Sequence, residues 1–172
     1  MKPPSPVILI VDDIRSDQLL ITHAIRKSGV DHPIHCLSSG NEAIAYLDGR
    51  GKFSDRARFP YPSFIVTDLK MPDGDGFSIL AYLQHNPQRA VMHTVVFSSS
   101  ADVDDIHRSY LLGASSYFVK PTDIGTLQRL IKILTDYWCA CEIPEVDSAG
   151  RWKQTESAGK LGERFARMVP EL

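Results

Sequence analysis

Five side chains that lie far apart in the sequence have types suited to phosphoryl transfer: Asp12, Asp13, Asp68, Ser98 and Lys120. Three carboxylates at close range repel one another, so such a group requires a cation. Hard oxygen ligands with open positions suit Mg²⁺. A lysine opposite the metal would neutralise a phosphoryl group between them, and a serine hydroxyl would hydrogen-bond another of its oxygens. These residue types predict Mg²⁺-dependent phosphoryl transfer onto Asp68.

Each of these residues stands where a short apolar run ends, and such runs predict buried strands. The runs are 7–11 before Asp12 and Asp13, 64–66 before Asp68, 94–97 before Ser98, and 117–119 before Lys120. The carboxyl ends of parallel strands share one edge of the sheet, where ligands bind in folds of this class. Each residue also has a simpler explanation when taken singly. The Asp12-Asp13 pair could cap a helix, Ser98 could merely end a strand, and Lys120 could be a solvated surface lysine. Their shared position at strand ends favours a common site.

Helical patterns separate the predicted strands, and a further short strand is expected over residues 34–37. The patterns cover residues 20–29, 40–48, 77–85, 103–111 and 124–138. Five alternations of strand and helix predict an α/β fold, with a doubly wound parallel sheet and helices on both faces. Residues 49–62 contain glycines and prolines without periodicity, which predicts a long loop.

The chain has 172 residues and is 43% hydrophobic, which suits one domain of ordinary size. We expect this domain to cover residues 1–142, followed by a tail of residues 143–172. About thirty residues are too few for an ordinary output domain. In the tail, Leu161, Phe165, Met168 and Val169 share one helical face, so a short amphipathic helix and a solvated tail both remain open.

Charge and composition argue against several partners and locations. A net charge of -2 lacks the positive excess that favours nucleic acid. The apolar run at residues 7–11 is too short for a signal sequence or a membrane span, so we expect a cytoplasmic protein without a membrane partner. Three cysteines form neither a disulfide framework nor a zinc pattern, which predicts reduced thiols.

Three motifs resemble those of the receiver domains of two-component response regulators. Asp12-Asp13 resembles the acidic pair of that family, Lys120-Pro121 matches its lysine-proline pair, and residues 68–76 (D-L-K-M-P-D-G-D-G) match its D-x-x-M-P-x-x-D-G run. The resemblance spans residues 7–138. It implies a flavodoxin-like five-stranded sheet of order 2-1-3-4-5 and a signalling module that is not an enzyme in its own right.

The resemblance also implies the chemistry of the site. Asp68 would accept the phosphoryl group from the phosphohistidine of a partner histidine kinase. Mg²⁺ would be bound by Asp13 and Asp68 with the backbone carbonyl of Lys70, and Asp12 would act through water.

Two switch positions and one peptide bond follow from the same resemblance. Ser98 and Tyr117 correspond to the hydroxyl and aromatic switch positions of the family. The bond between Lys120 and Pro121 is expected to be cis, because proline is the residue for which a cis bond is least costly.

Two features depart from the commonest receiver pattern: the long loop at residues 49–62, and Thr122, which stands where a large apolar residue is frequent. The long loop and the Tyr137-Trp138 ending are similar to single-domain regulators that serve phytochrome-type histidine kinases. We therefore expect such a kinase as partner. Two large aromatics at the end of an amphipathic helix also predict a homodimer centred on Tyr137 and Trp138, with Trp138 as part of the core as the alternative.

Two other functions remain open from the residues alone. A phosphohydrolase with Asp68 as nucleophile commonly has a second acid two residues later, where this chain has Lys70. A flavin or nucleotide carrier is disfavoured because Asp12 and Asp13 would repel the phosphate of its ligand. Incubation with a small phosphodonor and Mg²⁺ separates these functions, because either a stable acyl phosphate forms or a substrate turns over.

Overall fold

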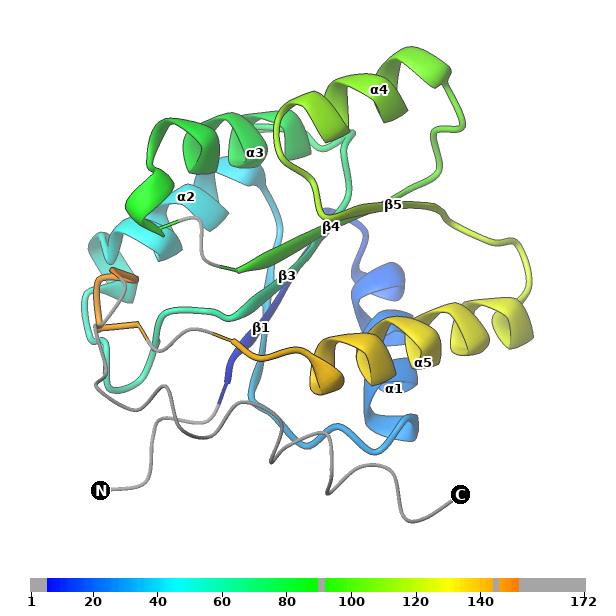
Figure 1. The fold of residues 1–172 in the computed structure, drawn as a ribbon, viewed down its shortest axis with the longest axis horizontal. Helices are drawn as coiled ribbons and strands as arrows, with labels where there is room; N and C mark the ends of the chain where they lie inside the picture. The colour runs from blue at the N-terminus through cyan, green and yellow to red at the C-terminus, as the bar shows by residue number, and fades with distance from the viewer. Residues whose placement is uncertain (1–5, 90–91, 144–145, 152–172) are drawn as a thin grey trace.

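The computed structural model describes residues 6–89, 92–143 and 146–151. Five parallel strands form one sheet in the order β2-β1-β3-β4-β5 (Figure 1). The strands are β1 (Ile8–Val11), β2 (Ile34–Leu37), β3 (Phe64–Thr67), β4 (His93–Ser98) and β5 (Ser116–Val119). The helices are α1 (Arg15–Lys27), α2 (Gly40–Asp48), α3 (Gly76–His85), α4 (Val103–Leu111) and α5 (Ile124–Ala140). The predicted α/β class and strand order are confirmed.

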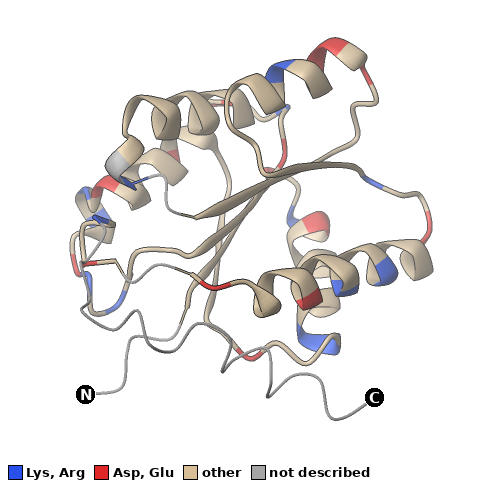
Figure 2. Ribbon diagram, in the orientation of Figure 1, with Lys and Arg blue, Asp and Glu red and all other residues tan. Residues whose placement is uncertain are grey.

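Helices cover both faces of the sheet. Because side chains alternate along a strand, Ile8 and Ile10 of β1 pack into one core with residues of α1 and α5. Leu9 and Val11 point the other way, into a second core with residues of α2 and α3. Figure 1 shows α1 and α5 together on one side of the sheet, with α2, α3 and α4 on the other. Figure 2 shows charged residues on helices and at strand ends, and no strand carries one.

The predicted loop at residues 49–62 contains a short 3-10 helix, Gly51–Phe53, and packs closely on α2. The rings of Phe53 and Phe59 lie 5.0 and 6.0 Å from that of Tyr46. The Arg56 guanidinium donates to the backbone carbonyls of Tyr46 and Leu47 in the last turn of α2. This loop therefore extends the core on the α2 face.

Trp138 belongs to the core, so its predicted place at the centre of a dimer contact was wrong. Its side chain is 1% exposed and packs 5.0 Å from the ring of Phe64 and 5.4 Å from that of His32. The neighbouring Tyr137 points outward and is 58% exposed. Adjacent positions on a helix differ by about 100° in direction, which explains why one ring is covered and the other is not.

The first described residues of the predicted tail lie against the domain. Val146 packs against the core on the α2 and α3 face, and Gly150 approaches the ring of Tyr61 so closely that a Cβ atom would lie 2.2 Å from it. The residues expected to form a short helix, 161–169, lie outside the described ranges. In the described part of the chain no helix is long and apolar enough to cross a membrane. None of the three cysteines, all of which lie in the described ranges, forms a disulfide bond.

Candidate phosphoacceptor and metal site

Backbone pairing continues one residue past three strands and brings the predicted site residues into line. The backbone N–H of Asp68 donates to the carbonyl of Val11, and that of Asp12 donates to the carbonyl of Leu37. Lys120 donates in the same way to the carbonyl of Ser98 at 2.8 Å. The strand-end residues therefore share one edge because each is an extension of the ladder.

The carboxylate of Asp68 is held from two sides. Its Oδ1 atom accepts a hydrogen bond from the backbone N–H of Leu69 at 2.6 Å, and its Oδ2 atom lies 3.1 Å from Nζ of Lys120. The residue is only 6% exposed. These contacts fix one oxygen to the backbone and turn the other towards a cation.

Asp12, Asp13 and Asp68 form a cluster suited to a metal ion. Each offers a carboxylate oxygen, and the three oxygens lie within 4.8 Å of one another. Asp13 is exposed, whereas Asp12 is 1% exposed. A set of carboxylate oxygens with one side open to solvent fits a hard divalent cation that keeps some of its water ligands.

Lys120 reaches this cluster from the end of β5. Its Nζ atom lies 2.7 Å from Oδ2 of Asp12 and 2.8 Å from Oδ2 of Asp17, in addition to its contact with Asp68. No peptide bond is cis among the described residues, so the Lys120-Pro121 bond is trans and the expected cis bond was wrong. The long lysine side chain spans the gap to the carboxylates from a trans backbone.

Burial and ion pairing oppose each other in the pKa values of this group. Burial raises the pKa of Asp12 above its ordinary value, and the hydrogen bonds from Lys120 and from the backbone of Ile14 offset only part of that effect. Burial alone would lower the pKa of Lys120, but its carboxylate partners raise it instead. The ammonium therefore stays charged and partly neutralises the acids.

The turn after Asp68 is fixed by close backbone contacts. A Cβ atom on Gly76 would lie 2.3 Å from the carbonyl oxygen of Asp68, so only glycine lets α3 begin this close to the strand end. Gly40 at the start of α2 donates to the carbonyl of Gly74 at 2.7 Å. The side chain of Asp75 caps α3 by accepting from the backbone N–H of Ser78. The glycines of the D-x-x-M-P-x-x-D-G run thus hold the loop that carries Asp68.

The two predicted switch residues lie in adjacent strands. Ser98 is fully buried at the end of β4, and its Oγ accepts a hydrogen bond from the backbone N–H of Ser100 at 3.4 Å. The hydroxyl of Tyr117 in β5 donates to the carbonyl of Ser100 at 2.8 Å. Ser100 also donates to Asp105 of α4, so both residues connect to the segment that precedes α4.

Sequence reasoning missed two residues of the first turn of α1. Asp17 pairs with Lys120, and the buried amide of Gln18 donates to the backbone carbonyls of Asp12 and Leu37. Gln18 thereby ties the end of β1 to the end of β2. The sequence does offer one indication of both residues, because they lie in the helical turn that directly follows the acidic pair Asp12-Asp13.

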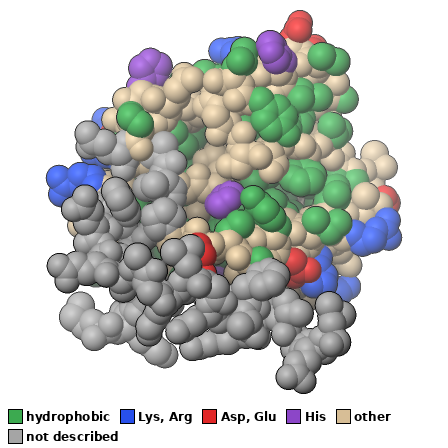
Figure 3. All heavy atoms as spheres, viewed as in Figure 1, with side chains coloured by type: hydrophobic (Ala, Val, Ile, Leu, Met, Phe, Trp, Pro, Cys, Tyr) green, Lys and Arg blue, Asp and Glu red, His purple; other side chains and the backbone are tan. Residues whose placement is uncertain are grey.

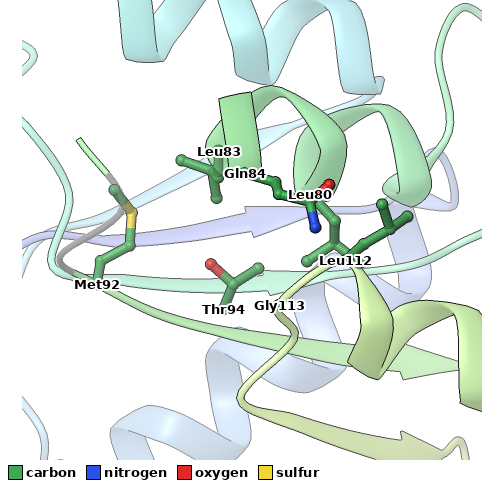
Figure 4. A pocket seen from close by; sticks show the side chains of 7 residues that line it. All are labelled: Leu80, Leu83, Gln84, Met92, Thr94, Leu112 and Gly113. Carbon is green, nitrogen blue, oxygen red and sulfur yellow. The ribbon is translucent and has the colours of Figure 1, made fainter. Parts of the chain in front are cut away.

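An apolar cavity of about 110 Å³ lies away from this edge, between α3, the start of β4 and the turn after α4 (Figure 4). Leu80, Leu83 and Met92 point into it, with Thr94 and Leu112 at its sides. None of the predicted site residues lines it. This cavity is therefore separate from the predicted site at the carboxyl edge of the sheet.

A parallel sheet that gathers carboxylates and a lysine at its carboxyl edge defines a phosphoryl-accepting class of domain. The chain matches the family model of the response regulator receiver domain over residues 8–132, and it belongs to this family. It is thus a signalling module of two-component systems, phosphorylated on an aspartate. The phosphohydrolase alternative is not favoured.

Two similar proteins, Rcp1 and RcpA, illustrate the place of the chain within the family. It is 30% identical over 135 residues to response regulator Rcp1 of Synechocystis sp., covering 78% of this chain and 90% of Rcp1. The crystal structure of the phosphorylated cyanobacterial phytochrome response regulator RcpA has a TM-score of 0.75 and 31% identity, covering 82% of this chain and 99% of RcpA. The crystal structure of the Mn²⁺-bound form of Rcp1 has a TM-score of 0.74 and 29% identity, and the match covers 81% of this chain and 99% of Rcp1.

Proposed function

We propose that Asp68 is the phosphoacceptor. The observation that carries this proposal is the arrangement of its carboxylate, with Oδ1 bound to the backbone and Oδ2 facing Lys120 at 3.1 Å. In the transfer, the bond from phosphorus to a histidine nitrogen of the kinase breaks, and a bond from phosphorus to an Asp68 oxygen forms. Lys120 would neutralise the phosphoryl oxygens as they move onto the protein.

A divalent metal, which we propose to be Mg²⁺, supports this reaction. Asp13 and Asp68 would bind it with the backbone carbonyl of Lys70, and Asp12 would act through water. When bound, such an ion neutralises the negative charge that the acids and the phosphoryl group bring together. The three carboxylates within 4.8 Å of one another, and the Mn²⁺-bound form of the similar Rcp1, support this assignment.

Ser98 and Tyr117 are proposed to sense the phosphoryl group. The Ser98 hydroxyl would bind a phosphoryl oxygen, which would pull on the Ser100 segment that both residues contact. Because Ser100 is also bonded to Asp105, a shift there would reach α4. The change would act by shifting the populations of two conformations.

The partner is proposed to be a phytochrome-type histidine kinase, because RcpA is a phytochrome response regulator.

We also propose a homodimer through α5. Val119, Ile124, Ile133 and Tyr137 are between 42% and 62% exposed, and Figure 3 shows hydrophobic side chains gathered over the face with β5 and α5. Apolar patches of this kind mark contact surfaces. The expected cytoplasmic location stays a prediction.

The test of the phosphoacceptor is Asp68→Asn, which keeps the shape of the side chain but removes the nucleophilic carboxylate. The full chain is incubated with acetyl phosphate and Mg²⁺ and its mass is measured. We expect one phosphoryl group on the wild type and none on the variant. Asp136→Asn on the exposed surface of α5 is the matched control and should react normally.

Retained phosphorylation of Asp68→Asn would refute the assignment. Rapid donor turnover by the wild type without an acyl phosphate would favour the phosphohydrolase instead.

A further inference from the structure

Lys120 has a third carboxylate partner that does not come from a strand end. Its ammonium lies 2.7 Å from Asp12, 2.8 Å from Asp17 and 3.1 Å from Asp68. An ammonium has three N–H donors, so these three contacts use all of them. Two of the three partners, Asp12 and Asp68, belong to the acidic cluster, whereas Asp17 comes from α1.

The pair between Asp17 and Lys120 is shielded from solvent. The side chain of Lys120 is 13% exposed and that of Asp17 is 27% exposed. Fully exposed pairs contribute little because water screens them and both side chains lose freedom. A mostly covered pair at 2.8 Å restricts its partners more strongly, because less water competes for the charges.

The backbone of Asp17 is fixed relative to Asp12. The Asp12 carboxylate accepts from the backbone N–H of Ile14, and the carbonyl of Ile14 accepts from the backbone N–H of Asp17. The Gln18 amide then binds the carbonyl of Asp12 at 2.6 Å. This short chain of hydrogen bonds makes the first turn of α1 a rigid support for the Asp17 carboxylate.

Without Asp17 the lysine would have room to move. A cavity of about 100 Å³ lies beside the pair, with Asp17 and Lys120 on its wall next to Leu20, Phe97 and Pro121. A flexible lysine stem can lie along such an apolar wall while its ammonium stays in water. Other rotamers of Lys120 are therefore sterically available, and they would take the ammonium away from Asp68.

We propose that Asp17 is a positioning residue for phosphoryl transfer, acting through Lys120. Together with Asp12 it occupies two of the three ammonium donors and so aims the third at Asp68, where a phosphoryl oxygen would accept it. The inference rests on the proposed role of Asp68. It adds to that role a group on α1 that touches neither the phosphoryl group nor the acidic cluster.

The test compares Asp17→Ala, Asp17→Asn and Asp17→Glu with the wild type in the full chain. The rate of phosphorylation by acetyl phosphate is followed over a range of donor concentrations with excess Mg²⁺. We expect the maximal rate of Asp17→Ala to fall on the order of tenfold, because a misplaced catalytic group loses much of its effect. The donor concentration for half-maximal rate should change little, since Asp17 does not contact the donor.

Rescue separates positioning from general stability. Asp17→Glu keeps the charge and should recover most of the rate, whereas Asp17→Asn should not. Asp136→Ala, which removes the exposed partner of Lys132 on α5, is the matched control and should react like the wild type. Melting temperatures of all variants check that each is folded.

A second measurement does not depend on phosphorylation. The Lys120 ammonium should give a protected NMR signal in the wild type that is lost in Asp17→Ala. A wild-type or faster maximal rate in Asp17→Ala, or an unchanged ammonium signal, would overturn the inference. A wild type that is not phosphorylated at Asp68 would instead refute the proposed function, and the ammonium signal would still report on the pairing.

Discussion

Replacement of Lys120 by methionine tests how the acids at the sheet edge are neutralised. The substitution keeps the length of the side chain but removes the ammonium, so that Asp12, at 1% exposed, loses its cation. Removal of one partner from a buried ion pair costs about 3 kcal/mol or more. We therefore expect metal-free Lys120→Met to be less stable than the wild type by about 3 kcal/mol.

Mg²⁺ should restore much of the lost stability, because the metal and the Lys120 ammonium neutralise some of the same carboxylates. In the wild type the Lys120 ammonium contacts Asp12 and Asp68, so it would repel a metal ion bound to the same carboxylates. Without that charge, we expect Mg²⁺ affinity to rise at least about tenfold, equivalent to about 1.4 kcal/mol. Saturating Mg²⁺ should therefore stabilise the variant more than it stabilises the wild type.

Urea unfolding with a chelator and with excess Mg²⁺ measures both effects. Lys132→Met, which removes an exposed ion pair with Asp136, is the matched control and should leave both quantities near their wild-type values. Equal or weaker Mg²⁺ binding by Lys120→Met would show that the ammonium does not compete for the carboxylates, and the electrostatic account of the site would fail.

Two further predictions concern stability and assembly. Burial and the charge of Arg58 lower the pKa of His35, so the unfolded chain binds its proton more readily and stability falls as the pH drops below about 6.5. In His35→Phe, unfolding measured between about pH 7 and pH 5 should show a smaller fall, and an unchanged one would contradict this reasoning. Tyr137→Asp should weaken the proposed dimer in light scattering with the fold intact, whereas a wild type that stays monomeric at every concentration, phosphorylated or not, would exclude the dimer.

The order of elements could be predicted because each strand is a short apolar run and each run ends at a polar residue. The strand ends were harder to predict, as β4 shows. It begins at His93, which pairs with Phe64 of β3. Histidine is polar and this one is only half-buried, so the apolar pattern of the sequence does not include it in the strand. In α4 the apolar residues Val103 and Leu111 are exposed and only Ser109 is buried, so apolar spacing alone did not reveal which face is covered.

Residues that extend the strands could be placed from the sequence, because backbone pairing alone sets the positions of Asp12, Asp68 and Lys120. Asp17 could not be placed in this way. Its contact with Lys120 depends on how α1 crosses the sheet and on which rotamer a long side chain adopts across the sheet edge. Trp138 differs from Asp17 in this respect, because it lies on the same helical face as the buried Leu127, Ile131 and Leu134, so the spacing of α5 already places it in the core against Phe64. The ends of the predicted strands therefore indicate which edge of the sheet carries the site. The helices that border this edge determine how its charged side chains are oriented.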